Sequence, residues 1–417
     1  MRNFFLFFFG CIYIGNLFAQ RNSKLLDSIV QSRENLKRVV LAKKKYRPQI
    51  IYTQINRDTN NKPTFTNHTY LLDSNNYFYC ASLVKLPCSI FALEKINNLN
   101  INGLNKSSIM LTDSAGPCQH KQLKDTTSQN RFPSVEHHIK KMLLVSDNYS
   151  FSRIWEFLNP KYIQNRLSQL GYPRARIVHR LDAGCVGVGN KYFNPVSFVD
   201  SSNKTLYSQP ADSLTEEFTT PFENLVLGRD IYSKRKRRIS EKKDFTKSNF
   251  LSLEMIHGMM QKLVFMELEN QHSKYNLSNS DWQFLMKHLG MYPRESEFPK
   301  NDPKTYYDSF KKYFIYGSAV SSINSDSLRI FNIVGRAYGF VIDCAYIVNF
   351  KTKTEFLLSS VIYTNKRNSF GTGKYEYDSI GLPFLQELSL ALYKYECNRK
   401  KKFLPNLESV NFYGIDE

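Results

Sequence analysis

The sequence predicts an α+β fold, an α/β sandwich in which an antiparallel sheet is flanked by terminal helices and lies beside an all-helical subdomain. The order of the expected elements carries this prediction: a helix, strands, a helical middle, strands and a last helix. Hydrophobic residues make up 42% of the 417-residue chain, which is enough for a large core and argues against global disorder.

Apolar periodicity places the elements of the first half. Residues 22–45 carry apolar side chains near helical spacing, and Ser82 is expected to open a helix that continues to Leu93. Pro87 lies close enough to the start of that helix to be tolerated. Strands are expected over residues 49–57 and 70–80, further helices over 133–145, 151–158 and 162–170, and a glycine-bearing loop over 177–195.

The second half begins with a change in character. Residues 201–316 are interpreted as a helical insertion, with helices at about 251–269 and 281–289. After it we expect strands over 330–350, broken near Gly335, and over 355–364, and then a helix over 383–397. No internal repeat is evident, so residues 20–417 are expected to form one domain.

The N-terminus has the pattern of a signal peptide. Arg2 supplies a positive charge, residues 4–18 are apolar and aromatic, and Leu17-Phe18-Ala19 suits cleavage before Gln20. The apolar run is short for a bilayer span, so a permanent anchor is the less favoured alternative. We therefore expect residues 1–19 to be removed and the rest to be exported to the periplasm or the exterior as a soluble monomer.

The net charge of +20 is strongly basic. It fits either attraction to an anionic cell-wall polymer or membrane surface, or a lysine-rich composition that keeps an exported protein soluble; we favour the second. The one concentrated basic run, residues 234–238, is expected to be a solvated loop. The sequence has no zinc-finger spacing and no aromatic-basic RNA-binding signature, so no nucleic-acid partner is expected.

Neither the cysteines nor the histidines predict a metal or a cofactor. The six cysteines after residue 19 show no Cys-x-x-Cys spacing. Cys80 and Cys88 flank Ser82, and both a disulfide and two buried free thiols remain open. His137 and His138 are expected on a helix with a wet face, where adjacent residues do not point the same way. His179 stands alone in sequence.

The first candidate catalytic motif is the Ser-x-x-Lys run Ser82-Leu83-Val84-Lys85. Three residues are almost one helical turn, so Lys85 should lie over the face of Ser82. A hydroxyl needs a nearby base to become a nucleophile, and a partly desolvated lysine can be that base. Four other Ser-x-x-Lys runs show how weak this motif is alone. Taken by itself, Ser82 would be a helix N-cap and Lys85 a surface residue.

The second motif is Ser146-Asp147-Asn148, which occurs once. Alone it would indicate an ordinary turn after a helix. Together, residues 77–93, 133–158 and 331–348 resemble the class A β-lactamase-like serine hydrolases, relatives of the D-Ala-D-Ala peptidases. The resemblance covers most of the chain outside the insertion. It implies a β-lactamase/transpeptidase-like fold.

The resemblance also implies roles for four side chains. The residue matching Ser82 is acylated in that family, and the lysine matching Lys85 helps to deprotonate it. The serine matching Ser146 relays a proton to the leaving nitrogen, and the asparagine matching Asn148 binds the substrate's side-chain amide.

The third family motif is altered. Ile333 stands where a lysine is expected to bind the substrate carboxylate and tune the proton relay, whereas Gly335 matches the family glycine. The N–H of Arg336 would join that of Ser82 in an oxyanion hole. Strand alternation puts residues 333 and 335 on one face and Arg336 on the other, so Arg336 is an imperfect substitute. Loss of activity or a different substrate would follow.

Arg180-Leu181-Asp182 resembles the loop segment that carries the deacylating glutamate of class A enzymes, with Asp182 in place of glutamate. Aspartate is one methylene shorter, which misplaces a water. The alternative, which we favour, is that Arg180 and Asp182 pin the loop by an ion pair. The acyl-enzyme would then hydrolyse slowly, as in penicillin-binding proteins.

Three functions follow from these motifs. The first is a serine hydrolase that opens β-lactam or related amide bonds through acylation of Ser82. The second is a D-Ala-D-Ala peptidase or transpeptidase acting on peptidoglycan peptides. The third is a degenerate, non-catalytic binder, motivated by Ile333.

Overall fold

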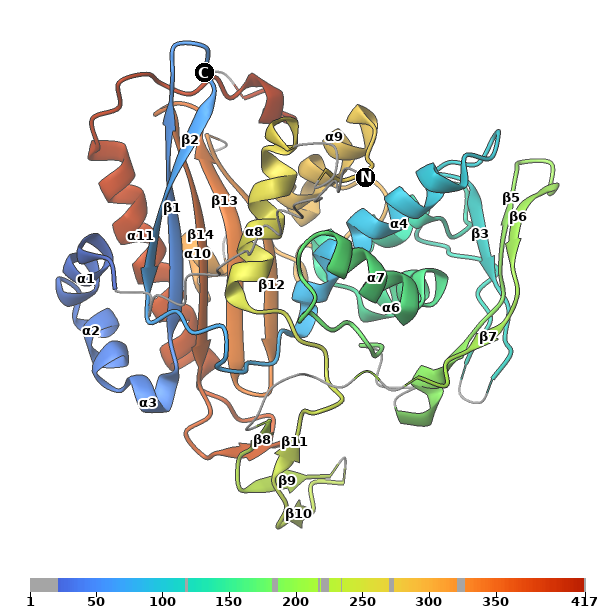
Figure 1. Cartoon of the computed structure of the whole chain (residues 1–417), viewed down its shortest axis with the longest axis horizontal. Helices are drawn as coiled ribbons and strands as arrows, with labels where there is room; N and C mark the ends of the chain where they lie inside the picture. Colours follow the sequence, from blue (N-terminus) through green and yellow to red (C-terminus); the bar gives the residue numbers. More distant parts are fainter. Residues whose placement is uncertain are drawn as a thin grey trace, which may run out of the picture.

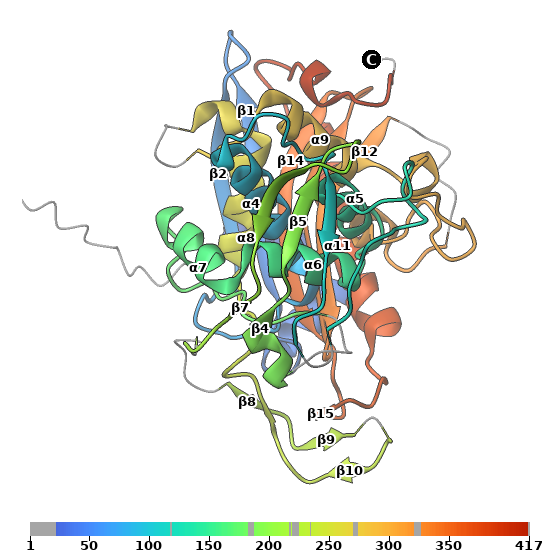
Figure 2. The ribbon, with the colours of Figure 1, turned by 90° about the vertical axis from the view of Figure 1, so that its right-hand side faces the viewer.

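The computed structural model describes residues 22–415 apart from 117–118, 182–186, 217, 219–224, 234, 270–273 and 321–326. The expected signal peptide, Asp182, Cys118 and Cys185 therefore lie outside the described residues. Figures 1 and 2 show a large sheet on one side of the molecule and a helical subdomain on the other.

The central sheet has five strands in the order β12-β13-β14-β1-β2, and all neighbouring pairs are antiparallel. The register Ile51↔Ser359 joins the N-terminal and C-terminal parts of the chain in the middle of this sheet. The predicted antiparallel sheet is confirmed. Its strands are β1 (Gln49–Arg57), β2 (Pro63–Tyr70), β12 (Leu328–Ala337), β13 (Phe340–Asn349) and β14 (Thr354–Tyr363).

The terminal helices cover one face of the sheet, as expected (Figure 1). They are α1 (Lys24–Gln31), α2 (Glu34–Leu41), α3 (Lys43–Tyr46) and α11 (Leu382–Asn398). The single helix expected over 22–45 is three short helices. The first break is at Arg33, whose extended backbone (φ −127°, ψ 119°) separates α1 from α2. The short turn segment α10 (Tyr313–Tyr316) packs against α11 and β13 on the same face.

The opposite face is covered by α8 (Leu253–Val264) and by the helical subdomain. Helix α4 (Lys85–Leu99) runs through the middle of that subdomain and packs against α5, α6 and α7. It is apolar on nearly every side, which is the pattern of a helix buried by its neighbours. Around it lie α5 (Val135–Val145), α6 (Asn148–Leu158), α7 (Pro160–Gln169) and α9 (Asn279–Gly290).

Two strand predictions were wrong in position. Strand β2 occupies the Asn- and Thr-rich stretch, whereas 71–80 has no strand. β2 is the edge of the sheet, and its outward face tolerates polar residues because water satisfies them. The break expected near Gly335 lies at Tyr338-Gly339, a two-residue turn with positive φ at both positions (53° and 87°), and β12 runs straight through Gly335.

The helical insertion predicted over 201–316 needs correction. Its first part contains short strands, and helices α8 and α9 pack on the central sheet as part of the core. Sequence periodicity identified both helices but carries no information on the surface they cover. Short strands from this region and from other parts of the chain form small outer sheets: β3 (Ile109–Thr112), β5 (Val196–Val199) and β6 (Thr205–Gln209); β4 (Tyr192–Phe193) and β7 (Asp212–Ser213); β8 (Val226–Leu227) and β11 (Lys243–Asp244); β9 (Asp230–Tyr232), β10 (Arg238–Ile239) and β15 (Ser369–Phe370).

The structure also bears on the cysteines, on the basic run and on possible membrane-spanning helices. Cys80, Cys88 and Cys344 are buried free thiols and Cys397 is an exposed one, so no disulfide joins the cysteines beside Ser82. Residues 235–238 of the basic run are exposed on the β9–β10 hairpin. Within the described residues, no helix has the length and apolar character that crossing a bilayer requires.

Candidate active site

Ser82 lies on a tight turn that enters the central helix of the subdomain. The turn is a 3₁₀ helix, Ala81–Val84, and it leads directly into α4. Ala81 adopts a left-handed conformation (φ 48°), which is uncommon for a residue with a side chain and marks a backbone held by its surroundings. Ser82 is inside the turn and its side chain caps no helix, so the N-cap alternative is wrong.

Lys85 is completely buried and faces Ser82. Its Nζ lies 2.8 Å from Ser82 Oγ and 2.9 Å from Ser146 Oγ. It also donates to the Ser146 carbonyl oxygen at 2.6 Å and to Asn148 Oδ1 at 2.7 Å. The two sequence motifs therefore meet at one ammonium group, and the alternative of a surface lysine is wrong.

The Ser146-Asp147-Asn148 segment is the junction between α5 and α6. Ser146 ends α5 in the left-handed conformation (φ 60°, ψ 41°), and Asp147 is the N-cap of α6, where its carboxylate accepts from Ser150 N at 2.7 Å. The turn expected from these residue types is present. It turns the Ser146 carbonyl and hydroxyl and the Asn148 amide toward Lys85.

The contacts of Lys85 fit a neutral amine. The Ser146 carbonyl and Asn148 Oδ1 can only accept, so they take the two N–H groups that a neutral amine has. The single lone pair is then left for one of the two hydroxyls, and that of Ser82 can donate to it. Burial, followed by repulsion from Lys311, lowers the pKa of Lys85 well below its usual 10.5. Lys85 can therefore act as a base toward Ser82.

Strand β12 approaches this turn closely at Gly335. A Cβ placed on Gly335 would lie only 2.6 Å from the Cys80 carbonyl oxygen, so a glycine is required there. Because β12 is the edge strand of the sheet, N–H groups on its outer side are not taken up by a neighbouring strand. This close contact between Gly335 of β12 and Cys80 of the turn, called the seam below, brings the backbone around Arg336 toward the turn of Ser82.

The side chains of β12 alternate as predicted. Ile333 is buried with the helices on the subdomain side, whereas Val334 packs with the terminal helices. Arg336 is exposed, and its guanidinium lies over the rings of Tyr313 and Tyr377 at 5.9 and 5.5 Å. The position of the expected lysine is thus an apolar side chain, and Arg336 is on the other face.

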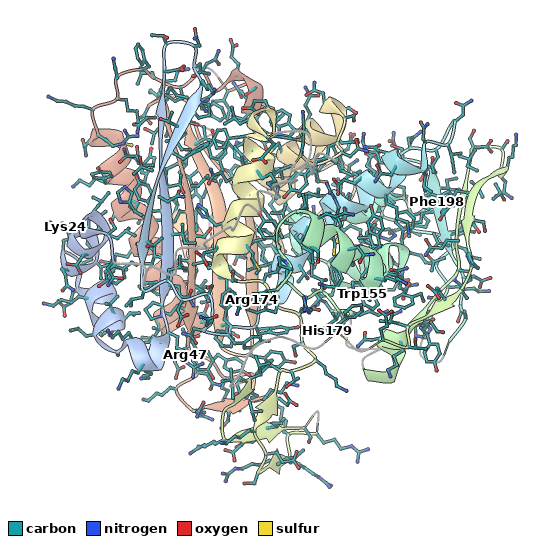
Figure 3. All side chains as sticks on the ribbon, viewed as in Figure 1. Lys24, Arg47, Trp155, Arg174, His179 and Phe198 are labelled. Atoms are coloured by element: carbon teal, nitrogen blue, oxygen red, sulfur yellow. The ribbon has the colours of Figure 1, made fainter. Side chains whose placement is uncertain are left out.

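The loop that follows α7 is anchored at Arg180. The Arg180 guanidinium is buried against Glu156, with Nε 2.9 Å from Glu156 Oε1, and it also donates to the Tyr192 carbonyl at 2.6 Å. Arg153 approaches the same carboxylate at 3.1 Å. The anchoring role expected of Arg180 is present with Glu156, and Asp182 lies outside the described residues. The ring of His179, labelled in Figure 3, stacks on the ring of Tyr79, with 4° between the two ring planes.

The adjacent histidines are not on a wet face. His137 and His138 are both buried: Nε2 of His137 contacts Thr127 Oγ1 at 2.8 Å and Nδ1 of His138 contacts Ser150 Oγ at 3.2 Å. The helix is covered on this side by the loop before it and by α6. No group of three or more His, Cys, Asp or Glu side chains suited to a metal occurs in the described part of the chain.

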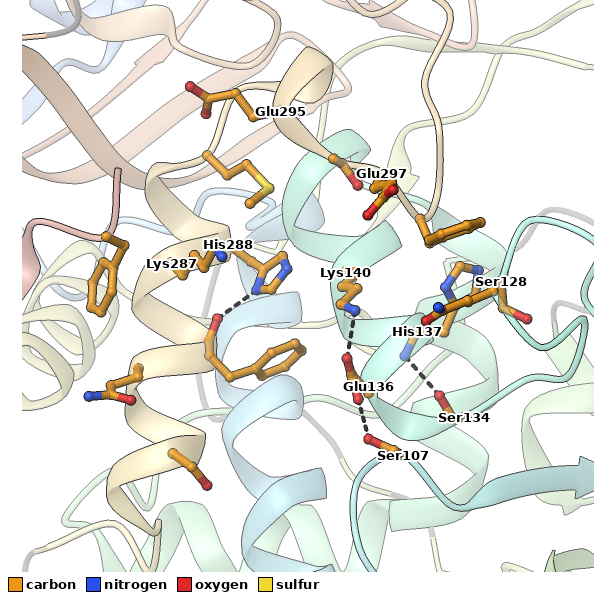
Figure 4. Close-up of a pocket in the computed structure, with 18 of the residues that line it drawn as sticks. Ser107, Ser128, Ser134, Glu136, His137, Lys140, Lys287, His288, Glu295 and Glu297 are labelled. Atoms are coloured by element: carbon orange, nitrogen blue, oxygen red, sulfur yellow. Dashed lines mark hydrogen bonds and ion pairs between the residues drawn. The ribbon is translucent and has the colours of Figure 1, made fainter. Parts of the chain in front are cut away.

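A larger polar pocket lies away from Ser82, between α5 and α9 (Figure 4). Its charged groups neutralise one another in part, since Lys140 Nζ lies 2.5 Å from Glu136 Oε1. His288 donates through Nδ1 to the Phe284 carbonyl oxygen, 2.7 Å away. The pocket contains no serine paired with a buried base, so it is a weaker candidate for nucleophilic chemistry than the Ser82 site.

A model of the Beta-lactamase enzyme family matches residues 31–279, more than half of the chain. The chain belongs to this family. The match spans both motifs that meet at Lys85. It ends before β12, so the altered third motif lies outside it.

Solved structures similar to this family member include the TLA-1 extended spectrum β-lactamase, with 12% identity, a TM-score of 0.48, and 89% of this chain and 98% of that chain covered. A β-lactamase from Chitinophaga pinensis DSM 2588 gives 9% identity, a TM-score of 0.47, and coverage of 89% and 98%. PBP-A gives 11% identity, a TM-score of 0.48, and coverage of 90% and 98%. No curated protein matches the sequence.

Sequence reasoning missed one group beside the site, Lys311. It lines the same hollow as Ser146 and Ile333. The only sequence signal near it is the run Ser309 to Lys312, one of the four other Ser-x-x-Lys matches. That run is not a second catalytic pair, because Lys312 Nζ donates to the carbonyls of Leu289 and Ile330 at 2.8 and 2.7 Å.

Proposed function

We propose that this protein is a serine hydrolase of the β-lactamase and penicillin-binding type, in which Ser82 is acylated by a β-lactam or a related amide. The observation that carries the proposal is the fully buried Lys85, whose Nζ lies 2.8 Å from Ser82 Oγ. A lysine without its proton at this distance removes the proton of the hydroxyl as the oxygen attacks the carbonyl carbon. The C–N bond of the amide then breaks and an ester to Ser82 remains.

The leaving nitrogen needs a proton, and Ser146 is positioned to relay it. Its Oγ lies 2.9 Å from Lys85 Nζ, so the proton taken from Ser82 has a path through Lys85 to Ser146 and on to the nitrogen. The Asn148 amide nitrogen remains available for a substrate carbonyl, because its Oδ1 accepts from Lys85. This assigns Ser82, Lys85 and Ser146 to catalysis and Asn148 to substrate binding.

The negative charge on the attacked carbonyl oxygen requires donors. We assign the N–H groups of Ser82 and Arg336 to this oxyanion hole, supported by the close seam at Gly335, where a Cβ would meet the Cys80 carbonyl at 2.6 Å. The start of the α4 turn adds its dipole to these donors. Asp182 would activate the deacylating water only if it does not pin the loop with Arg180, the role that the sequence favours.

The substrates of this proposal are a small β-lactam or a peptidoglycan peptide, handled by an exported monomer. The predicted signal peptide supports export to where such substrates occur, and the full chain's charge of +20 would suit an anionic wall or membrane surface. A peptidase and a lactamase share the acylation step and differ in how fast the acyl-enzyme is hydrolysed.

The test is the intact mass of the purified protein after incubation with benzylpenicillin, beside Ser82→Ala. We expect the parent to gain the mass of the drug and the variant to gain nothing. A persistent adduct indicates the penicillin-binding type, and consumption of the drug without an adduct indicates a lactamase. If no covalent adduct forms and the drug is not consumed, acylation of Ser82 is wrong and the non-catalytic binder takes its place.

A further inference from the structure

Two short segments of the chain form a strongly basic lobe at one end of the molecule. This basic lobe comprises residues 225–247 and 366–374, which contain the strands β8 to β11 and β15. Both views show β8, β9 and β10 projecting from the body, at the end away from the β1–β2 turn (Figures 1 and 2). The two segments hold twelve Lys and Arg against three Asp and Glu, so +9 of the chain's net charge of +20 is concentrated here.

The acidic side chains of the basic lobe leave most of this charge uncompensated. Asp230 is buried and shared by two guanidinium groups, with Arg229 Nε at 3.0 Å and Arg238 Nη2 at 2.9 Å from its carboxylate oxygens. Asp244 accepts from the backbone N–H and the hydroxyl of Thr246 at 2.8 and 2.6 Å. Three further cations of the basic lobe are exposed and form no ion pair with a carboxylate in the described part of the chain: Arg235, Arg237 and Lys242. Cations gathered in this way attract an anionic partner.

Apolar side chains are exposed among these cations. Ile239, on the outer strand β10, is 41% exposed, and Val226 of β8 is 51% exposed. Ile239 pairs with Ile231, and Ile231 pairs with Phe370, so the three side chains form one row across the sheet β10-β9-β15. The row begins at the buried Phe370 and ends at Ile239 in solvent. A polyanion is attracted by cations alone, whereas a bilayer interface also takes up apolar side chains, so this pattern favours a membrane surface.

Aromatic rings join the basic lobe to the segment that leads into the Ser82 turn. The ring centre of the buried Phe245 lies 5.9 Å from that of Tyr79, and that of Tyr338 lies 5.0 Å from the same ring. Phe370 packs on Phe245 and Tyr338, with ring centres 5.5 and 6.0 Å apart. Tyr79 comes three residues before Ser82, a length of chain that spans at most about 10 Å. A surface bound by the basic lobe therefore lies on the side of the protein from which the chain enters the Ser82 turn.

We propose that the basic lobe docks this protein on an anionic phospholipid surface, with its cations at the lipid phosphates and Ile239 in the interface. The exposed apolar side chains are the reason to choose a bilayer over an anionic wall polymer. This inference goes beyond the proposed function and does not rest on it, because the basic lobe contains none of the residues assigned to acylation.

The test is co-sedimentation of the purified protein with vesicles made of equal parts phosphatidylglycerol and phosphatidylcholine, and with vesicles of phosphatidylcholine alone. We expect binding to the anionic vesicles that weakens with added salt, and much weaker binding to the neutral ones. A Lys or Arg near an anionic surface contributes about fivefold in affinity, so Arg235→Gln/Arg237→Gln/Lys242→Gln should weaken binding roughly 100-fold. All proteins compared keep the same N-terminus, so the difference between them reports the basic lobe.

The matched control, Lys62→Gln/Lys351→Gln/Lys402→Gln, removes the same charge at three exposed positions outside the basic lobe. It should bind the anionic vesicles within about threefold of the parent, because these positions do not face the docked surface. Thermal melting of each variant establishes that it is folded. Equal losses in the two triple variants, or no loss in either, would overturn the assignment of the docking surface. A parent that binds both kinds of vesicle equally would do the same.

Ile239→Ser separates a bilayer from an anionic polymer, because it keeps every charge. It should weaken binding to the anionic vesicles about fivefold and leave binding to soluble polyphosphate unchanged, since only the bilayer takes up the isoleucine. If the variant binds the vesicles as tightly as the parent, the cations act alone and a wall polymer takes the place of the bilayer. The adduct at Ser82 is measured without vesicles, so failure of the docking proposal and failure of the proposed function are distinguishable.

Discussion

Gly335→Ala tests the seam between β12 and the turn of Ser82. A Cβ at this position would lie 2.6 Å from the Cys80 carbonyl oxygen, 3.1 Å from Ile342 Cδ1 and 3.4 Å from Ala81 Cβ. An ordinary carbon–oxygen contact is about 3.3 Å, so the strand and the turn must separate by about 0.7 Å. Gly335 is not among the residues with positive φ, so the cost is steric and not conformational.

Two effects should follow from that displacement. Overpacking of this kind costs about 1–3 kcal/mol, which for a chain of this size lowers the Tm by about 1–4 °C. Misplacing an oxyanion donor by a large fraction of an ångström should slow acylation of Ser82 by about 10- to 100-fold. The assays are a circular-dichroism melt and the time course of the benzylpenicillin adduct by mass.

Gly258→Ala is the control, because it adds the same methyl group in α8, where it meets the Tyr172 hydroxyl at 3.1 Å. That hydroxyl is the end of a side chain and can move, so acylation should change less than about twofold. A Gly335→Ala protein that melts with the parent and acylates within threefold of its rate would refute the proposed contact between β12 and the turn.

Three further predictions follow from the buried charges. Acylation should rise with pH to a midpoint well below 10.5, because burial lowers the pKa of Lys85 and the neutral amine is the base; a midpoint at or above 10.5 would count against Lys85. Glu156→Gln should cost about 3–5 kcal/mol in urea unfolding, because it leaves buried guanidinium groups without their anion. Glu136→Gln, in a more exposed helix pair, should cost only about 0.5 kcal/mol; equal losses would contradict this reasoning. Burial lowers the pKa of His257 to about 4 while the unfolded value is 6.5, so the unfolded chain binds more protons between these pH values and stability falls on acidification. The loss from this group between pH 6.5 and 5 is about 1.6 kcal/mol, and His257→Gln should flatten that part of the urea-midpoint profile.

The parts of the fold that the sequence predicted are those with strong local signals. Strand β1 and helix α5 were predicted from their local apolar patterns. The helix expected over 151–158 was also found, but α6 begins three residues earlier, at Asn148, where Asp147 caps it. Strand β2 was missed because an edge strand with a wet face carries threonine and asparagine where a buried strand carries apolar residues. The broken N-terminal helix was missed because apolar spacing continues across Arg33 although the backbone does not.

The site residues likewise divide into those whose contacts follow from local geometry and those whose contacts depend on the tertiary structure. Ser82 and Lys85 are one turn apart, so their contact follows from local geometry once the turn is assigned. Their meeting with Ser146 came from the family resemblance, since nothing in the spacing of the two motifs fixes a contact across 61 residues. Lys311 was missed because its position depends on tertiary anchoring that leaves no periodic trace in the sequence.

One side chain, that of Asn332, ties β12 to the segment that carries Lys311. Asn332 precedes the apolar Ile333 and points to the other face of β12, where Nδ2 donates to the Lys311 carbonyl at 2.8 Å and to Asp343 Oδ1 at 2.9 Å. Its Oδ1 accepts from Lys312, so two of its three side-chain hydrogen bonds hold the neighbouring segment. The segment that carries Lys311 is therefore fixed against β12 by a side chain of the strand itself, and this tertiary anchoring is not visible in the sequence.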